Sequence, residues 1–370
     1  MTGDLRVDVD RQAIAELISD AMVGHAPRKR ELPFGLPSGT VKTYALEVNG
    51  TAGDTQKAAE RAHDIARAAG LEFAATRDPA LLLTWQGELG MVVDVLDPRF
   101  WLVHTTAPAG RVQQLLRSLV GRSTDMDWCW FPGSSIRRMQ ADGDTKWFKT
   151  DFRGDELLAS QPVEARRLKV QLEGDQAQRL YELLAQTQEY KSSTALTAIA
   201  VRLGDGHLGW VDEAAYYRGR FVARGESFEV HLGFVSKWVQ DYAATVRTIE
   251  TEHRISWSAA SDGGAYSFSG GPITVSLGRP IEDLDQFAAA LFSCRDPFRL
   301  WAVPRSAGRD AIEAEVVDLH VGQQMRMDIT REWIRVYLPE NACGNTIMRL
   351  VSNLQHRYDA SVVEPGGAPG

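Results

Sequence analysis

The sequence predicts an α+β protein with mostly antiparallel sheets and helices packed on one face of each sheet. Many short segments alternate apolar and polar residues, a pattern typical of half-buried strands. In addition, a strand that leads directly into an amphipathic helix recurs three times. The chain has 370 residues, of which 44% are hydrophobic and 24% are charged. At about 100 to 200 residues per domain, this length predicts two or three domains.

Each of the three strand-to-helix segments, called openings below, begins with about five residues of period-2 alternation. Apolar residues at helical spacing then predict a helix with one apolar face. Acidic residues such as Asp10 and Asp175 stand near the predicted helix starts, where the positive end of the helix dipole favours them. The openings are residues 5–10 leading into 11–23, residues 168–172 leading into 175–187, and residues 273–277 leading into 281–292.

A block of short strands, a second helix and a final strand follow each opening. After the first opening we expect strands at 41–48, 81–85, 91–96 and 100–105, a helix at 111–120 and a strand at 128–131. After the second we expect strands at 195–203, 208–217, 220–223 and 228–232, a helix at 237–250 and a strand at 253–257. After the third we expect strands at 298–303, 311–319, 325–329 and 333–338, a helix at 345–358 and a strand at 361–363.

This order predicts three tandem units of strand, helix, three to four strands, helix and strand. They are residues 1–155 with an inserted helix at 55–69, residues 156–265, residues 266–363, and a disordered tail at 364–370 rich in Gly and Pro. Linkers are expected at 27–39, 132–154 and 258–271. Processivity clamps that encircle DNA share an approximately similar order of elements, so a clamp-like or saddle-like protein that tracks DNA is one alternative.

Charge and composition limit the classes of function. The formal net charge of −8 opposes a chain-wide electrostatic contact with nucleic acid or anionic lipid, so any such contact has to be local. Residues 1–20 carry seven charges and no apolar run, which predicts no signal peptide, and no apolar stretch is long enough for a membrane span. Three cysteines without a CxxC pair are typical of reduced thiols, so we expect a cytoplasmic protein without membrane contact. Arginine outnumbers lysine 33 to 8, which suits a GC-rich bacterial genome as well as bidentate recognition of anions.

Sequence motifs favour a protein without catalysis. Gly204 to Gly209 fits G-x-G-x-x-G, but Asp205-Gly206 is a hairpin signal, and we expect a turn between strands there. The eight histidines form no metal-binding motif, and no nucleophile motif occurs, so the sequence predicts neither a metal site nor a cofactor.

The segment from residue 128 to 153 is the richest in aromatic and basic residues. Bases of a flexible nucleic acid stack on aromatic rings while Arg and Lys bind its phosphates, so this composition indicates a local nucleic-acid site. Alternating rings are also typical of a half-buried strand, and three aspartates dilute the charge. The candidate nucleic-acid residues are Arg137, Arg138, Lys146, Trp147 and Lys149.

These features together predict a non-catalytic binding or scaffold subunit of a cytosolic bacterial assembly. Its partner would be another protein or further copies of the same chain, with nucleic acid as an additional ligand. The alternative is an enzyme whose dispersed site lies between units. Its candidate residues end three similar strands, Trp101-Leu-Val-His104, Phe228-Glu-Val-His231 and Ile334-Arg-Val-Tyr337, so they are His104, His231 and Tyr337.

Overall fold

The computed structural model describes residues 5–25, 32–51, 53–159, 166–204, 207–259 and 266–363. Helices alternate with strands, and most of the strand pairs are antiparallel, so the predicted α+β class is confirmed. The chain forms two compact units with interleaved segments. Unit 1 comprises Met1–Cys129, Met139–Lys146 and Ala200–Asp241, and unit 2 comprises Trp130–Arg138, Trp147–Ile199 and Tyr242–Gly370. These units do not coincide with the three tandem units, which stay a prediction.

Unit 1 is built on a sheet with the strand order β1-β3-β4-β5-β6-β2-β12-β11, and β7 pairs with β2. The strand β2 lies between β6 and β12, and all eight of its residues are buried. The strands of unit 1 are β1 (Leu5–Arg6), β2 (Val41–Val48), β3 (Glu72–Ala75), β4 (Leu81–Gln86), β5 (Leu89–Asp94), β6 (Phe100–Thr105), β7 (Met126–Trp128), β11 (Val211–Tyr216) and β12 (Arg220–Gly225).

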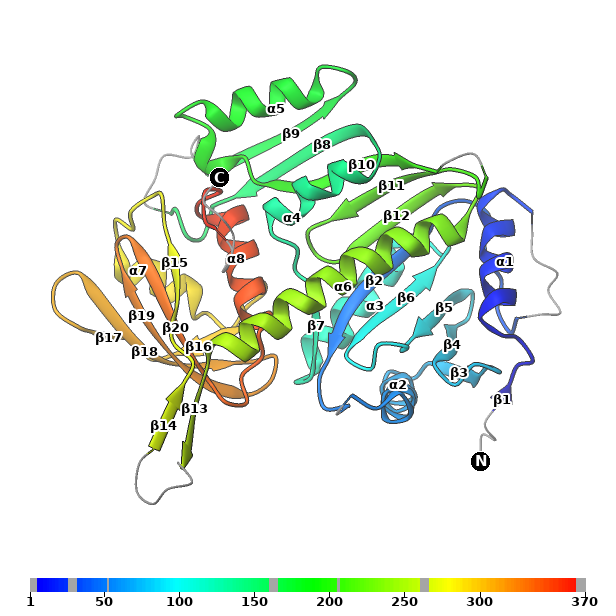
Figure 1. Cartoon of the computed structure of the whole chain (residues 1–370), viewed down its shortest axis with the longest axis horizontal. Coiled ribbons are helices and arrows are strands. Elements are labelled where there is room, and N and C mark those ends of the chain that lie inside the picture. The colour runs from blue at the N-terminus through cyan, green and yellow to red at the C-terminus, as the bar shows by residue number, and fades with distance from the viewer. Residues whose placement is uncertain are drawn as a thin grey trace. The chain divides into compact units, whose positions relative to one another are not determined.

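Helices pack against this sheet. The helix α6 (Phe228–His253), which starts in unit 1 and continues into unit 2, passes in front of β2 and β12 (Figure 1). Phe73 of β3 stacks on His63 of α2 at a centroid distance of 4.8 Å. The other helices of unit 1 are α1 (Arg11–Met22), α2 (Thr55–Ala68) and α3 (Ala109–Arg122). Asp10, which was predicted to stand at a helix start, caps α1, and Asp54 caps α2; both accept backbone N–H bonds.

Unit 2 contains a sheet with the order β14-β13-β20-β19-β18-β16, in which β15 pairs with β20 and β17 with β18. Its strands are β13 (Arg254–Ala259), β14 (Tyr266–Ser269), β15 (Ile273–Ser276), β16 (Leu300–Ala302), β17 (Arg305–Ser306), β18 (Ala311–Asp318), β19 (Gln323–Thr330) and β20 (Trp333–Pro339). The strand β8 (Asp144–Arg153), which begins in unit 1, pairs antiparallel with β9 (Arg167–Glu173). The strand β10 (Leu196–Leu203) also runs from one unit into the other.

The helices of unit 2 are α4 (Gly133–Arg138), α5 (Ala177–Gln186), α7 (Leu284–Leu291) and α8 (Asn345–Arg357), with short 3-10 turns at Met139–Asp142 and Lys191–Ser193. All three openings are a strand followed by a helix, as predicted: β1 and α1, β9 and α5, and β15 and α7. The inserted helix is α2. Among the described residues, none of the helices combines the length and the apolar character needed to cross a membrane.

Four predicted elements are wrong. The predicted linker at 258–271 contains the end of β13 and the whole of β14. Residues 228–232 begin α6 instead of forming a strand, because the Ser227 hydroxyl accepts the N–H of Val230 at 3.2 Å and caps the first turn. The predicted linker at 132–154 contains α4 and β8. Residues 361–363 form no strand, because the Asp359 carboxylate accepts the N–H of Ser361 at 3.0 Å and holds a turn. The predicted hairpin residues Asp205-Gly206 and the tail at 364–370 lie outside the described residues.

Candidate functional site

Four polar side chains form a hydrogen-bonded chain inside unit 1, called the polar chain below. The Thr43 hydroxyl oxygen lies 2.8 Å from Nδ1 of His104 and 2.6 Å from Nε2 of His231. Nδ1 of His231 lies 2.6 Å from Oε2 of Glu213. The structure therefore joins two residues of the predicted enzyme site through a hydroxyl group. Thr43 and Glu213, which complete the chain, were not among the sequence candidates.

Strand register explains why these residues meet. Thr43 of β2 and His104 of β6 are directly opposite each other in an antiparallel pair, so their side chains share one face of the sheet. His231 lies in the first turn of α6, which places its ring against this face and not at a strand end as predicted. Phe228, three residues earlier on α6, meets the His104 ring edge-on at a centroid distance of 5.1 Å. The polar chain thus fastens the start of α6 to the centre of the sheet.

Burial decides the charge state of the polar chain. Burial lowers the pKa of His104 to about 3; the Asp94 carboxylate raises it, and His231 and Arg11 lower it further. His104 is therefore neutral at pH 7. Burial raises the pKa of Glu213, and this effect exceeds the opposing influence of His231 and of the backbone N–H of Val222.

The polar chain has two possible hydrogen-bond directions. When Glu213 is ionised and His231 is neutral, His231 donates from Nδ1 and accepts the Thr43 hydroxyl, which in turn accepts Nδ1–H of His104. When Glu213 is protonated, every bond reverses. In both cases Nε2 of His104 and Oε1 of Glu213 are buried without a hydrogen-bond partner among the described residues. The two arrangements differ by one proton, and since both end atoms are buried, the chain presents neither of them to a substrate.

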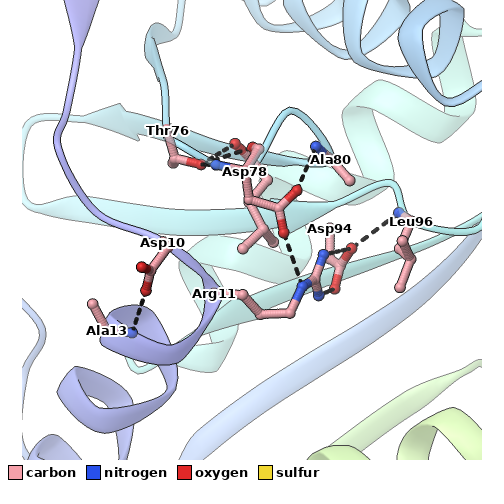
Figure 2. A network of polar contacts seen from close by, with 9 residues as sticks. Asp10, Arg11, Ala13, Thr76, Asp78, Ala80, Asp94 and Leu96 are labelled. Atoms are coloured by element: carbon pink, nitrogen blue, oxygen red, sulfur yellow. Dashed lines mark hydrogen bonds and ion pairs between the residues drawn. The ribbon is translucent and has the colours of Figure 1, made fainter.

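A second polar cluster lies next to His104. The guanidinium group of Arg11, the first residue of α1, donates from Nε to Asp78 at 3.0 Å and from Nη2 to Asp94 at 3.1 Å (Figure 2). Asp94 also accepts the backbone N–H of Leu96, and Asp78 accepts that of Ala80. Burial lowers the pKa of Arg11, but its bonds and charge attraction to both aspartates outweigh this and raise it. This cluster attaches α1 to the sheet and places the negative charge of Asp94 near His104.

Tyr337, the third candidate of the enzyme hypothesis, belongs to unit 2. It lies on β20, and its hydroxyl group donates to Oδ2 of Asp328 on β19 at 2.9 Å. The guanidinium carbon of Arg326 lies 5.7 Å from the centre of its ring. The described contacts of Tyr337 are therefore with the neighbouring strand of its own sheet.

The candidate nucleic-acid residues occupy different elements. Arg137 and Arg138 lie on α4, where Arg137 donates to the Tyr181 hydroxyl at 3.1 Å and Arg138 donates to Ser135 at 3.2 Å. Trp147 and Lys149 lie on β8, both half-buried. Lys146 is also on β8, but successive side chains of a strand point to opposite faces, so Lys146 lies on the face opposite to Trp147 and Lys149.

The pair of strands β8 and β9 has an apolar and a polar face. Phe148 and Phe152 are buried on the apolar face, whereas Trp147 and Lys149 alternate with them. Lys169 of β9 lies opposite Asp151 of β8 and is exposed on the same polar face. Burial raises the pKa of Asp151, but its bond to Arg153 and the charges of Arg153, Lys149 and Lys169 lower it overall. Two lysines and a tryptophan thus share the polar face, which we call the β8–β9 face.

Comparison with known proteins gives a family match. A family model described as MJECL33-like protein matches residues 8–367. The uncharacterized protein MJECL33 of the archaeon Methanocaldococcus jannaschii is 26% identical over 310 residues, covering 73% of this chain and 74% of the relative. Because this relative is archaeal, a bacterial source for the chain stays a prediction. Neither description names an activity or a ligand.

Proposed function

The chain belongs to the MJECL33-like protein family, and we propose that it is a non-catalytic binding subunit of a cytosolic assembly that engages a protein partner. One observation carries the proposal. Trp257 on β13 and Phe268 on β14 are 69% and 52% exposed, although both are large apolar side chains. The two strands, called the β13–β14 ribbon below, would form the docking surface.

The two rings form one apolar patch. Trp257 and Phe268 are directly opposite each other across the strand pair, so they point to the same face. Their centroids lie 5.0 Å apart in an edge-to-face arrangement. Covering a large apolar side chain contributes about 1.5 to 3 kcal/mol to binding, and aromatic residues are common among the side chains that dominate protein interfaces.

The backbone of the β13–β14 ribbon supports the same proposal. Among the described residues, β13 pairs with β20 through Arg254 and Ile255, and its outer part, Ser256–Ala259, pairs with β14. The ribbon therefore extends beyond the sheet of unit 2 (Figure 1). A two-stranded ribbon is marginally stable in water by itself, and β14 is the end strand of its sheet order. A partner strand added to β14 would supply both backbone hydrogen bonds and an apolar cover.

The experiment compares the tagged full chain with its Trp257→Ser, Phe268→Ser double variant in cells that naturally produce the protein. We expect one defined partner protein to co-purify with the wild type and to fall at least tenfold in the double variant, because both rings of the patch are removed. The measurement is quantitative mass spectrometry of the captured proteins. Hydrogen exchange in β13 and β14 should slow when the purified partner is added.

The matched control is Trp301→Ser, since Trp301 is 46% exposed but lies on β16 at the other end of the sheet order. Equal loss of the partner in this control would refute a role for the β13–β14 ribbon. Sedimentation of the purified chain distinguishes the partners: a dimer that is lost in the double variant would identify a second copy as the occupant.

The β8–β9 face favours nucleic acid as a second candidate ligand. Lys149 and Lys169 would bind phosphates and Trp147 would stack on a base. Single-stranded binding measured by fluorescence anisotropy should show a salt slope that falls by roughly 0.7 for each lysine changed to alanine. Trp147→Ala should weaken binding by about 1 to 3 kcal/mol. Lys57→Ala on α2 of unit 1 is the control, and an equal effect there would mean that only net charge matters.

A further inference from the structure

We propose that a cavity at the N-terminus of α3 in unit 1 binds a small phosphorylated ligand. The cavity has a volume of about 330 Å³, within the range of small-molecule sites. It combines a buried cation, an unpartnered hydroxyl group and a helix N-terminus. Its lining residues are Pro37, Ser38, Thr40, Lys42, Glu88, Leu89, Thr106, Pro108 and Arg111. This site is independent of the surfaces proposed above.

Lys42 supplies a positive charge that the protein leaves without an opposite charge. Its side chain is only 8% exposed, and Nζ donates to the backbone oxygen of Thr106 at 3.0 Å. Among the described residues no carboxylate forms an ion pair with Lys42, although Glu88 also lines the cavity. An ammonium group has three donors, so two remain for a ligand. Burial lowers the pKa of Lys42, which shows the cost of keeping this charge without an anion.

Thr106 supplies the second observation that points to a ligand. Its hydroxyl oxygen is buried and has no hydrogen-bond partner among the described residues, and its side chain lines the cavity. A buried polar atom without a partner costs about 1 to 3 kcal/mol, and a ligand oxygen in the cavity would remove this cost. The backbone oxygen of Thr106 accepts a hydrogen bond from the Lys42 ammonium group. This bond holds two donors close together, the ammonium group of Lys42 and the hydroxyl group of Thr106.

The helix α3 adds backbone donors. It has 14 residues, and no side chain caps its N-terminus, where Pro108 occupies the cap position. The first N–H groups of a helix have no intrahelical acceptor, and the helix dipole makes this end positive. The side chain of Arg111, in the first turn, also lines the cavity. An anion here would meet Lys42, Arg111 and the helix end, while Glu88 is the single negative side chain of the lining.

The combination favours a phosphate group attached to a small hydroxylated body. Phosphate matches several converging donors, and helix N-termini commonly bind it. The volume exceeds what a phosphate alone would fill, and Leu89, Pro37 and Pro108 offer apolar surface for the remainder. The carboxylate of Glu88 would repel a second phosphate but could accept a bond from a ligand hydroxyl group. A sugar phosphate fulfils all these conditions.

Isothermal titration of the full chain with ribose 5-phosphate tests the proposal. We expect saturable binding that inorganic phosphate competes for and ribose does not. Lys42→Met and Arg111→Ala should each weaken binding at least tenfold. Arg111 is exposed, so we expect the Arg111→Ala variant to fold. It therefore tests the proposal even if the variant of the buried Lys42 is unstable. The matched control is Arg117→Ala, an exposed residue of α3 that does not line the cavity, which should change binding less than twofold.

Three results would overturn the proposal. The first is the absence of heat and of any thermal shift with about 10 mM ribose 5-phosphate, a concentration that would fill most of a site with a dissociation constant of about 1 mM. The second is equal weakening by the Arg111 and Arg117 variants, which would indicate a general charge effect. The third is binding of citrate with no binding of either phosphate compound, which would assign the cavity to carboxylates.

Discussion

Replacing Arg349 with methionine is expected to lower the free energy of unfolding by about 3 to 5 kcal/mol. Arg349 on α8 and Asp318 on β18 form an ion pair at 2.5 Å, with side-chain exposures of 1% and 0%. Asp318 also accepts the Thr346 hydroxyl group and, at 2.9 Å, the backbone N–H of His320. Without the guanidinium group, the carboxylate would stay buried with only neutral donors. Denaturant unfolding followed by tryptophan fluorescence measures the loss.

The double variant Asp318→Asn with Arg349→Met tests whether the buried charge causes this loss. It should recover at least half of the destabilisation, because no unpaired charge remains. The matched control is Arg167→Met, which breaks the exposed pair with Asp155 in the same unit. An exposed pair of this kind contributes about 0 to 1 kcal/mol. If the Arg349 and Arg167 variants lose equal stability, the burial of the ion pair has no special effect.

The elements that the sequence predicted best are those in which a single residue pattern, typical of one kind of secondary structure, extends over the whole element. The strands β2 and β6 have the predicted bounds, because each is rich in β-branched and aromatic residues and turn-forming residues follow, Asn49-Gly50 after β2 and Pro108 after β6. The start of α6 was missed because Phe228-Glu-Val-His231 alternates like a strand over four residues. Ser227 before it and Glu229 in the first turn are helix-start signals that could have corrected the error.

The strand β8 was also missed although its sequence carries a strand signal. Its charged residues suggested a linker, yet Phe148, Thr150 and Phe152 alternate with more exposed neighbours, which is a strand pattern. The order of strands in the two compact units is harder to predict, since pairing between distant segments leaves no local signal. The segment Ala200–Asp241, for example, joins unit 1 after the intervening segment Trp147–Ile199 of unit 2.

Candidate sites depend on these distant pairings even more strongly. His104 and His231 could be named from the sequence because histidine stands out, but a threonine on a strand is common, so Thr43 carried no signal. The register of β2 against β6 alone places its hydroxyl group beside His104. The cavity at α3 likewise joins residues near positions 40, 88 and 106. A single sequence does not indicate that these three regions meet.

Acid is expected to destabilise the protein through His104. Its pKa in the folded state is about 3, against about 6.5 in an unfolded chain, because burial opposes the charged ring. Between these values the unfolded chain binds a proton that the folded protein does not. Stability is therefore fully retained above pH 6.5 and falls as the pH decreases, by about 1.4 kcal/mol per pH unit. From pH 6.5 to 4.5 the loss from this residue is about 2.3 kcal/mol, because half of the unfolded chains already carry the proton at pH 6.5.

The variant His104→Asn separates this contribution from the titration of carboxylates, which both proteins share. An asparagine amide can replace Nδ1 of the ring as the partner of Thr43 but binds no proton in this range. Denaturant unfolding at several pH values should therefore give a shallower pH dependence for the variant, by about 1 kcal/mol per pH unit between pH 6 and 4.5. The exposed His25 provides the control, and His25→Asn should keep the wild-type slope. Identical slopes in all three proteins would mean that His104 takes up a proton inside the folded sheet, and the neutral polar chain would have to be abandoned.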